Sequence, residues 1–165
     1  MAPESDQPAI PLRDDDLRRV CQLLQHHRVK YVLVGARACI LHGLVRSTQD
    51  VDLLVETSSD NYQRVIEALS ELPDGAAREL TVKDLEDNVV VKIADAVEVD
   101  VSTRAWTLTY DEAIKDAQSV EVEGVRIVYA SLDALIKSKS TYREQDAVDR
   151  QRLEWLKQEK ERSRR

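Results

Sequence analysis

Residues 31–56 read YVLVGARACILHGLVRSTQDVDLLVE, and this stretch decides the fold class. It opens on an apolar run that stops at Gly35 and is typical of a buried strand. Residues 36–43 predict a short helix that ends at Gly43, because glycine is common just beyond a helix C-terminus. Residues 50–56 predict a second strand. A strand, a glycine turn, a short helix and another strand therefore follow each other directly.

Outward from this stretch, helical and strand patterns alternate along the chain. The expected elements are helices over residues 13–27, from Ser58 to before Pro73, near 110–118, from Ser131 to about 139 and over 145–160, and strands at 89–91, at 97–102 and on both sides of Gly124, with a turn at Asp95. These elements predict an α/β (α+β) fold, a mixed β-sheet flanked by helices. We expect a single domain over residues 13–160, a flexible lead-in over 1–12 and a basic tail over 161–165.

The composition is that of a folded soluble protein of single-domain length, with 165 residues, of which 33% are charged and 42% hydrophobic. The net charge of −7 gives no overall positive field for nucleic acids. No apolar run approaches the roughly 20 residues of a membrane span, and the first residues lack the regions of a signal peptide. Cys21 and Cys39 are too few for a disulfide scaffold. We therefore expect a cytoplasmic protein with no membrane partner.

The second strand carries the triplet Asp50-Val51-Asp52, whose two carboxylates share one face because side chains alternate along a strand. They lie roughly 7 Å apart along the chain. Like charges at this distance favour a cation between them, and hard oxygen ligands favour Mg²⁺ or Mn²⁺ over zinc. In so acidic a chain, a solvated strand edge explains the triplet equally well.

A third carboxylate is expected from the strand at residues 97–102, where Glu98 and Asp100 share one face. If this strand lies beside that of Asp50, Asp100 joins the same cluster. Three converging carboxylates can hold two divalent ions, which align a nucleophile and a triphosphate for in-line phosphoryl transfer. The pattern thus predicts Asp50, Asp52 and Asp100 as metal ligands and catalytic residues.

The junction at Val34, Gly35 and Ala36 leads from a strand through a glycine into a helix. Backbone N–H groups at such a junction can approach a phosphate closely. The same junction is also a common turn that binds nothing, so both interpretations stay open here.

Together these motifs resemble the signature of the nucleotidyltransferase superfamily typified by DNA polymerase β: Gly35-Ala36, a gap of thirteen residues, then Asp50-Val51-Asp52-Leu53. A finer resemblance is to small bacterial nucleotidyltransferases related to the toxins of type IV toxin–antitoxin systems. Their motif residues are matched by Gly35, Ala36, Ala38, His42, Gly43, Arg46, Thr48, Asp50 and Asp52. Further matches are the strand of Asp100 and the element formed by Leu135, Ile136, Lys139, Arg143, Asp146 and Asp149. The resemblance spans about residues 14–156.

The resemblance implies a minimal nucleotidyltransferase fold and a Mg²⁺- or Mn²⁺-dependent enzyme that moves a nucleotide from an NTP to an acceptor. It implies nucleotide binding by Gly35, Ala36, Arg46, Thr48 and Lys139. It also implies tRNA or another macromolecule as acceptor and a cognate antitoxin protein as partner. Ala36 stands where the family has Gly or Ser, which removes a hydroxyl from the phosphate site. The short turn before Arg143 leaves open whether Lys137 or Lys139 is the family lysine.

Two other functions remain open at this point. One is a small-molecule adenylyltransferase of the antibiotic-modifying type, against which the short chain argues. The other is a non-catalytic nucleotide- or partner-binding module, against which the presence of all three carboxylates argues.

Asp146 and Asp149 share a helical face with Leu153, so they require cationic partners, because an unpaired buried charge is expensive. Lys139, Arg143 and Arg46 are the candidates for this pairing. Arg46 could equally be a surface residue.

Overall fold

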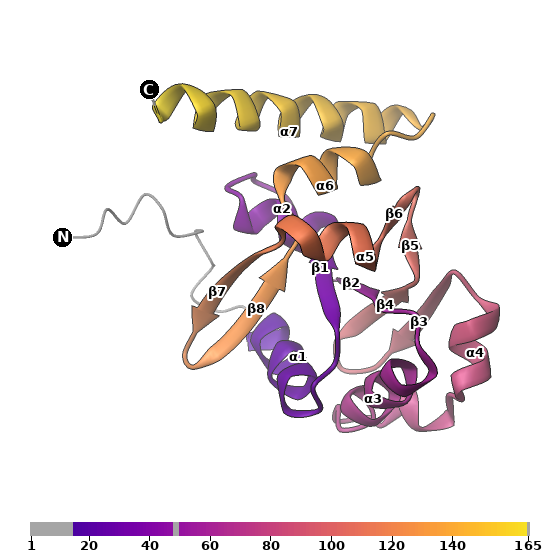
Figure 1. The fold of residues 1–165 in the computed structure, drawn as a ribbon. Helices are drawn as coiled ribbons and strands as arrows, with labels where there is room; N and C mark the ends of the chain where they lie inside the picture. The colour runs from indigo at the N-terminus through magenta and orange to yellow at the C-terminus, as the bar shows by residue number, and fades with distance from the viewer. Residues whose placement is uncertain (1–14, 48–49, 165) are drawn as a thin grey trace.

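The computed structural model describes residues 15–47 and 50–164, and Figure 1 shows the arrangement of its elements. The helices are α1 (Asp15–His26), α2 (Gly35–Leu41), α3 (Ser59–Leu69), α4 (Val82–Asp87), α5 (Tyr110–Ala113), α6 (Leu132–Ser138) and α7 (Glu144–Ser163), with 3₁₀ turns η2 (Ala76–Glu79) and η3 (Ile114–Asp116). The strands are β1 (Tyr31–Val34), β2 (Val51–Val55), β3 (Val90–Ala94), β4 (Glu98–Ser102), β5 (Arg104–Ala105), β6 (Leu108–Thr109), β7 (Gln118–Val122) and β8 (Val125–Tyr129).

The main sheet is six-stranded and mixed, in the order β3-β4-β2-β1-β8-β7. β2 runs parallel to β4 and β1 runs parallel to β8, whereas β1 and β2 are antiparallel. The hairpins β3–β4 and β7–β8 form the two edges of the sheet. A separate hairpin, β5–β6, follows β4. The predicted mixed sheet flanked by helices is thus confirmed.

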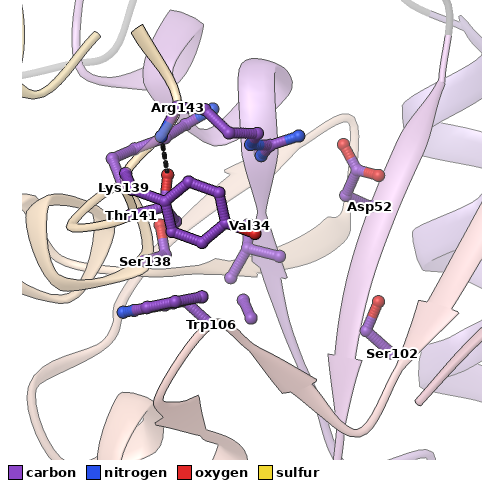
Figure 2. A pocket seen from close by; sticks show the side chains of 11 residues that line it. Val34, Asp52, Ser102, Trp106, Ser138, Lys139, Thr141 and Arg143 are labelled. Atoms are coloured by element: carbon purple, nitrogen blue, oxygen red, sulfur yellow. Dashed lines mark hydrogen bonds between the residues drawn. The ribbon is translucent and has the colours of Figure 1, made fainter. Parts of the chain in front are cut away.

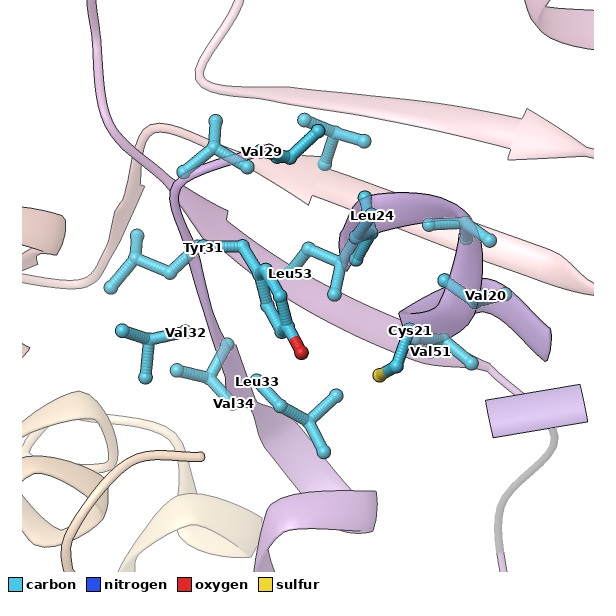
Figure 3. Packing of buried hydrophobic residues seen from close by; sticks show 14 of the residues in the cluster. Val20, Cys21, Leu24, Val29, Tyr31, Val32, Leu33, Val34, Val51 and Leu53 are labelled. Carbon is cyan, nitrogen blue, oxygen red and sulfur yellow. The ribbon is translucent and has the colours of Figure 1, made fainter. Parts of the chain in front are cut away.

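One face of the sheet is apolar and carries the main core. The register of β1 and β2 places Leu33 opposite Leu53, so both side chains point to this face. Figure 3 shows Cys21 and Leu24 of α1 beside Val51 and Leu53, and all of these side chains are buried. Complete burial of a Leu or Val stabilises the fold by about 1.5–3 kcal/mol. Helix α3 packs against α1 and completes this layer.

The C-terminal helices α6 and α7 pack against each other on the side of the molecule away from α1 and α3 (Figure 1). α6 also contacts α2 and β6, which fixes the pair to the rest of the domain. Ser131 caps α6, because its hydroxyl accepts a hydrogen bond from the backbone N–H of Ala134. Residues 139–143 connect the two helices and reach back toward the sheet.

Most predicted elements are present, with bounds that differ by a few residues. The predicted helix starts at Ser58 and Ser131 are confirmed, since both residues are N-caps, and so is the turn at Asp95 between β3 and β4. The sequence patterns miss α4 and the β5–β6 hairpin, because these elements are too short to show a period. α7 continues to Ser163, so the predicted basic tail begins inside a helix. The predicted lead-in over residues 1–12 lies outside the described residues.

Cys21 and Cys39 are both buried, and neither forms a disulfide. Among the helices of the described residues, none combines the length and the apolar character that crossing a lipid bilayer requires.

Candidate functional site

A row of polar side chains crosses the face of the sheet opposite α1. Asp52 of β2 pairs with Val34 of β1 on one side and with Asp100 of β4 on the other. Asp100 in turn pairs with Lys92 of the edge strand β3. Paired residues of neighbouring strands point to the same face, so this row is continuous. The predicted ligands Asp52 and Asp100 are therefore neighbours.

Asp50 and Glu98 form the next row, two positions earlier on the same two strands. A hydrogen bond shared with Asp50, and the charge of Asp50, raise the pKa of the Glu98 carboxyl. The Lys92 ammonium lies 3.8 Å from Asp50 Oδ2. Asp50, Asp52, Glu98 and Asp100 thus form an acidic patch on β2 and β4, with one lysine at its edge.

Among the described residues, no cation forms an ion pair with Asp52 or Asp100, and the charge of Lys139 only partly offsets the effects that raise the pKa of Asp52. Burial, the neighbouring charge of Asp100 and a hydrogen bond with it raise the pKa of the Asp52 carboxyl to about 6. Asp100 Oδ1 is buried and has no hydrogen-bond partner among the described residues. A buried carboxylate oxygen without a partner costs free energy, so a cation at this pair would stabilise the site.

This geometry fits a divalent cation that is shared with a substrate. Carboxylate oxygens are the ligands that Mg²⁺ and Mn²⁺ prefer. Within residues 15–47 and 50–164, however, no three Asp, Glu, His or Cys side chains are grouped so that they could hold a metal ion by themselves. Mg²⁺ commonly uses one or two carboxylates together with water and substrate phosphates, and Asp52 with Asp100 offers such a partial site.

Gly35 lies directly against Asp52. Its φ of +72° is in the left-handed region, which glycine adopts readily. A Cβ at this position would lie 2.2 Å from Asp52 Oδ2, which is far inside any non-bonded contact. Glycine is therefore required here both by the backbone and by the Asp52 side chain.

Arg37 fixes the backbone that carries Asp50. Its side chain is buried, and Nε donates a hydrogen bond of 3.1 Å to the Asp50 carbonyl oxygen. This charged donor ties α2 to the start of β2. Sequence reasoning missed Arg37, although an arginine inside the otherwise apolar helix at residues 35–41 is a usable signal.

A cavity of about 390 Å³ opens beside Asp52 (Figure 2). The sheet contributes Val34, Asp52 and Ser102, the start of α2 contributes Gly35, and the β5–β6 hairpin contributes Ala105 and Trp106. The segment between α6 and α7 contributes Ser138, Lys139, Thr141, Tyr142 and Arg143. Figure 2 shows Asp52 on one side of the cavity and Trp106 and Lys139 on the other. The cavity therefore joins an acidic side chain of the sheet to cations of the C-terminal helices.

Two buried aspartates of α7 hold these cations. Lys139 Nζ lies 3.4 Å from Asp146 Oδ1 and 3.1 Å from Asp149 Oδ2. Arg143 Nε lies 2.7 Å from Asp146 Oδ2, and Arg46 Nη1 lies 2.6 Å from Asp149 Oδ2. Burial opposes ionisation, but the hydrogen bonds and cations outweigh it and lower the pKa of both carboxyls. The prediction that these aspartates orient basic side chains is confirmed.

The predicted nucleotide-binding residues are only partly brought together. Gly35 and Lys139 line the cavity, whereas Ala36, in the first turn of α2, and Arg46, paired with α7, do not. Thr48 lies outside the described residues.

Lys139 and Lys137, the two candidates for the family lysine, occupy different environments. Lys139 lines the cavity, whereas Lys137 forms an ion pair with the exposed Glu112 on α5. The position of Lys139 favours it as the lysine that meets a ligand.

His42 is a packing residue in this fold. It is buried, and Nε2 donates a hydrogen bond of 2.7 Å to the Ala130 carbonyl oxygen. Its ring contacts Tyr129 edge to face, with 5.1 Å between centroids. Burial lowers the pKa of His42, which keeps the imidazole neutral near pH 7.

Sequence reasoning also missed Lys92, Trp106 and Tyr142. Lys92 is detectable once the β3–β4 hairpin is given its register, which sets it opposite Asp100. Trp106 and Tyr142 lie in a turn and a loop, where hydrophobic periodicity carries no information.

Comparisons with known proteins identify the family and the fold of the chain. The family model described as "Nucleotidyltransferase of unknown function (DUF6036)" matches residues 15–160. The chain is also similar in fold to the crystal structure of a candidate nucleotidyltransferase from Thermotoga maritima. The TM-score is 0.57 at 16% identity, and the match covers 91% of this chain and 98% of that one. No curated protein matches the chain. The chain therefore belongs to the DUF6036 family, within the nucleotidyltransferase superfamily.

Proposed function

We propose that the protein is a Mg²⁺- or Mn²⁺-dependent enzyme that transfers a nucleotide from an NTP to an acceptor. One observation carries the proposal: the neighbouring carboxylates of Asp52 and Asp100 are short of positive charge beside a cavity that also contains Lys139. Membership of the nucleotidyltransferase family supports an NTP as the substrate.

In this proposal Asp52 and Asp100 hold the divalent cation, and Asp50 is the third ligand. The 3.8 Å ion pair between Asp50 and Lys92 is partly exposed, with 35% of the Asp50 and 56% of the Lys92 side-chain area accessible, so Asp50 leaves it at little cost. A bound divalent cation supplies a Lewis acid at the phosphate oxygens.

The remaining chemistry is assigned to the side chains of the chain itself. The acceptor hydroxyl oxygen forms a bond to the α-phosphorus, the bond between that phosphorus and the oxygen bridging to the β-phosphate breaks, and pyrophosphate leaves. Asp100 accepts the hydroxyl proton. Lys139 balances the charge of the triphosphate, and its two aspartate partners hold its ammonium in place.

Phosphate contacts complete the proposed site. Gly35 has no side chain of its own, so the backbone at the start of α2 can approach phosphates next to the Asp52 carboxylate, which lies against it. Ala36, Arg46 and Thr48 are proposed as further phosphate contacts on the strength of the resemblance. For Arg46 this requires that it share its guanidinium between Asp149 and the ligand.

We propose tRNA or another macromolecule as the acceptor, in a toxin–antitoxin setting with a cognate antitoxin protein. The similarity to toxin-related nucleotidyltransferases supports this assignment. With a net charge of −7, the chain would need a local basic surface to bind RNA, and residues 157–164 carry four lysines and arginines against two glutamates.

The test is a transfer assay with purified protein, each α-labelled NTP and Mg²⁺, run against total tRNA, a protein extract and a pool of hydroxylated antibiotics. We expect transfer by the wild type, loss in EDTA, and a loss of at least about 100-fold in Asp52→Asn, because one stabilising group is removed from the transition state. Asp87→Asn, which alters an exposed pair with Lys83, is the matched control.

The acceptor pool that receives the label distinguishes between the possible functions. Transfer to the antibiotic pool alone would establish a small-molecule adenylyltransferase instead. NTP binding without transfer to any pool would identify a non-catalytic binding module.

A further inference from the structure

We propose that Trp106 and Tyr142 form the binding site for the base of the nucleoside triphosphate, an inference that rests on the proposed function. Trp106 lies in the turn of the β5–β6 hairpin, and Tyr142 lies between α6 and α7. Their ring centroids are 6.1 Å apart, with an interplanar angle of 75°. Both rings line the same cavity as Asp52 and Lys139. Two segments far apart in the sequence therefore bring aromatic rings to one end of the site.

These two rings are exposed, as is Trp155 at 60%, but they differ from Trp155 in lining one cavity together. The chain has two tryptophans, five tyrosines and no phenylalanine, and Tyr31, Tyr62 and Tyr129 are buried. Trp106 is 47% exposed and Tyr142 is 89% exposed. Single exposed aromatic residues are common, but here two meet at one cavity. A flat ligand would cover their apolar surface and gain stacking energy from it.

The backbone holds both rings in place at the cavity. Trp106 has φ of +57°, a conformation that disfavours a bulky side chain and that Asn or Gly adopts more easily. Arg28 and Glu123 also have positive φ, so this conformation belongs to the tight turn of the hairpin. On the other side, Thr141 Oγ1 and Arg143 Nε lie 2.5 Å and 2.7 Å from Asp146 Oδ2. The residues flanking Tyr142 are therefore fixed while its ring stays open to solvent.

The lining of the cavity offers contacts for each part of a nucleotide. Asp52 lies on one side of the cavity, and Trp106 and the cationic Lys139 lie on the other (Figure 2). Hydroxyls of Ser102 and Ser138 line the same space. A nucleoside triphosphate has a polyanion at one end, a hydroxylated sugar in the middle and a flat base at the other end. Because every base has a π face, stacking predicts binding of all four NTPs with little discrimination.

A second cavity, of about 560 Å³, adjoins the same hairpin and shares Ser102, Ala105 and Trp106 with the first. It is lined by Val90 and Arg104, among others, but by neither Lys139 nor Tyr142. Only the first cavity combines both aromatic rings with a phosphate-binding cation, so the base is assigned to the first cavity.

Fluorescence of Trp106 tests the proposal directly. Trp155, on α7, is the chain's other tryptophan and does not line the cavity, so Trp155→Phe leaves Trp106 as the single indole. With Mg²⁺ present, we expect each of the four NTPs to quench this emission on binding. Tripolyphosphate, which has no base, should bind without comparable quenching.

Calorimetric titration of variants provides the second measurement. Trp106→Asn and Tyr142→Ser should each raise the Kd for ATP by about 5- to 100-fold. They should change the Kd for tripolyphosphate by less than about twofold, because the phosphate contacts are kept. Trp106→Phe should recover part of the affinity. Trp155→Ala and Val90→Ala, outside the first cavity, are the matched controls and should bind ATP as the wild type does.

The outcomes separate this inference from the proposed function. Trp106→Asn should fold with an undiminished melting temperature, since Asn tolerates the left-handed backbone. Equal losses of ATP and tripolyphosphate binding would show that Trp106 only holds the loop, and would overturn the inference. If Val90→Ala weakens ATP binding and Tyr142→Ser does not, the base binds in the second cavity and the inference is wrong. Unchanged ATP binding in both aromatic variants would overturn the inference and leave the proposed function standing, whereas a wild type that binds neither ligand would end both.

Discussion

At the scale of single residues, Gly35 and Asp52 form one unit. The backbone of Gly35 is so close to the Asp52 carboxylate that neither residue can change without affecting the other. The raised pKa of Asp52 shows that the same carboxylate is held in an environment that disfavours its charge.

Gly35→Ala should abolish most activity while the protein still folds. The new Cβ would displace the Asp52 carboxylate, and misplacing a reacting group by about 1 Å can cost roughly 100-fold in rate. Gly124→Ala is the matched control, because Gly124 also has positive φ but nothing lies within 4 Å of the place that a Cβ would take there. Both variants should lose about 1 kcal/mol of stability or somewhat more from the backbone term. Nucleotide transfer that is equal in the two variants would show that the contact with Asp52 is irrelevant.

Asp52→Asn should stabilise the metal-free protein increasingly as pH rises. The folded-state pKa of Asp52 is raised to about 6, so its contribution to stability is present below the unfolded pKa and is lost as pH rises through 6. The Asn side chain does not ionise, so the variant does not lose stability in this way as pH rises. Urea unfolding in EDTA should therefore show the variant gaining about 1–2 kcal/mol on the wild type between pH 4 and pH 7.5. Added Mg²⁺ should favour the wild type instead, and a difference that is constant with pH would contradict the assignment.

At the scale of secondary-structure elements, the site is divided between two groups. The acidic patch lies on β2 and β4, whereas the cations come from α6, the loop after it and the segment before β2. Asp149 of α7 links these parts, because it contacts both Arg46 and Lys139. The long helix therefore contributes to the site through a buried ion pair.

Asp149→Asn should destabilise the protein and weaken NTP binding. The substitution removes one negative counter-ion from Arg46 and Lys139. Removing one partner of an ion pair lowers the free energy of unfolding by about 3–5 kcal/mol when both partners are fully buried. Because the two cations are each about a fifth exposed, with 20% and 19% of side-chain area, we expect about 1–3 kcal/mol by urea unfolding. The effect should shrink in acid, since the lowered pKa of Asp149 means that its contribution is lost as pH falls.

Asp133→Asn is the matched control for this variant. Asp133 pairs with Lys157 at the surface and is 62% exposed, so its loss should cost at most about 1 kcal/mol. If the two variants are equally stable, the Asp149 network contributes nothing beyond a surface ion pair.

At the scale of the whole molecule, the parts predictable from sequence are those with a regular period. β4 alternates apolar and polar residues throughout, and the chain at β2 alternates over Asp50-Val51-Asp52, so the face of each carboxylate follows from the sequence. Neither pattern shows that the two strands are neighbours in the sheet. Predicting that pairing requires a resemblance to a known family, and observing it requires a structure. Trp106 and Tyr142 could not be predicted, because their meeting depends on how a short hairpin and a helix connection pack together.

The division of the site along the chain also has a consequence for its synthesis. Asp100 precedes Lys139 by 39 positions, 139 minus 100, so translation at about 5–20 residues per second separates them by about 2–8 s. During that interval a chain on the ribosome carries the negative half of the site without Lys139. Such a nascent chain cannot yet bind a triphosphate as the finished protein does, and the activity appears only after α6 has emerged and folded.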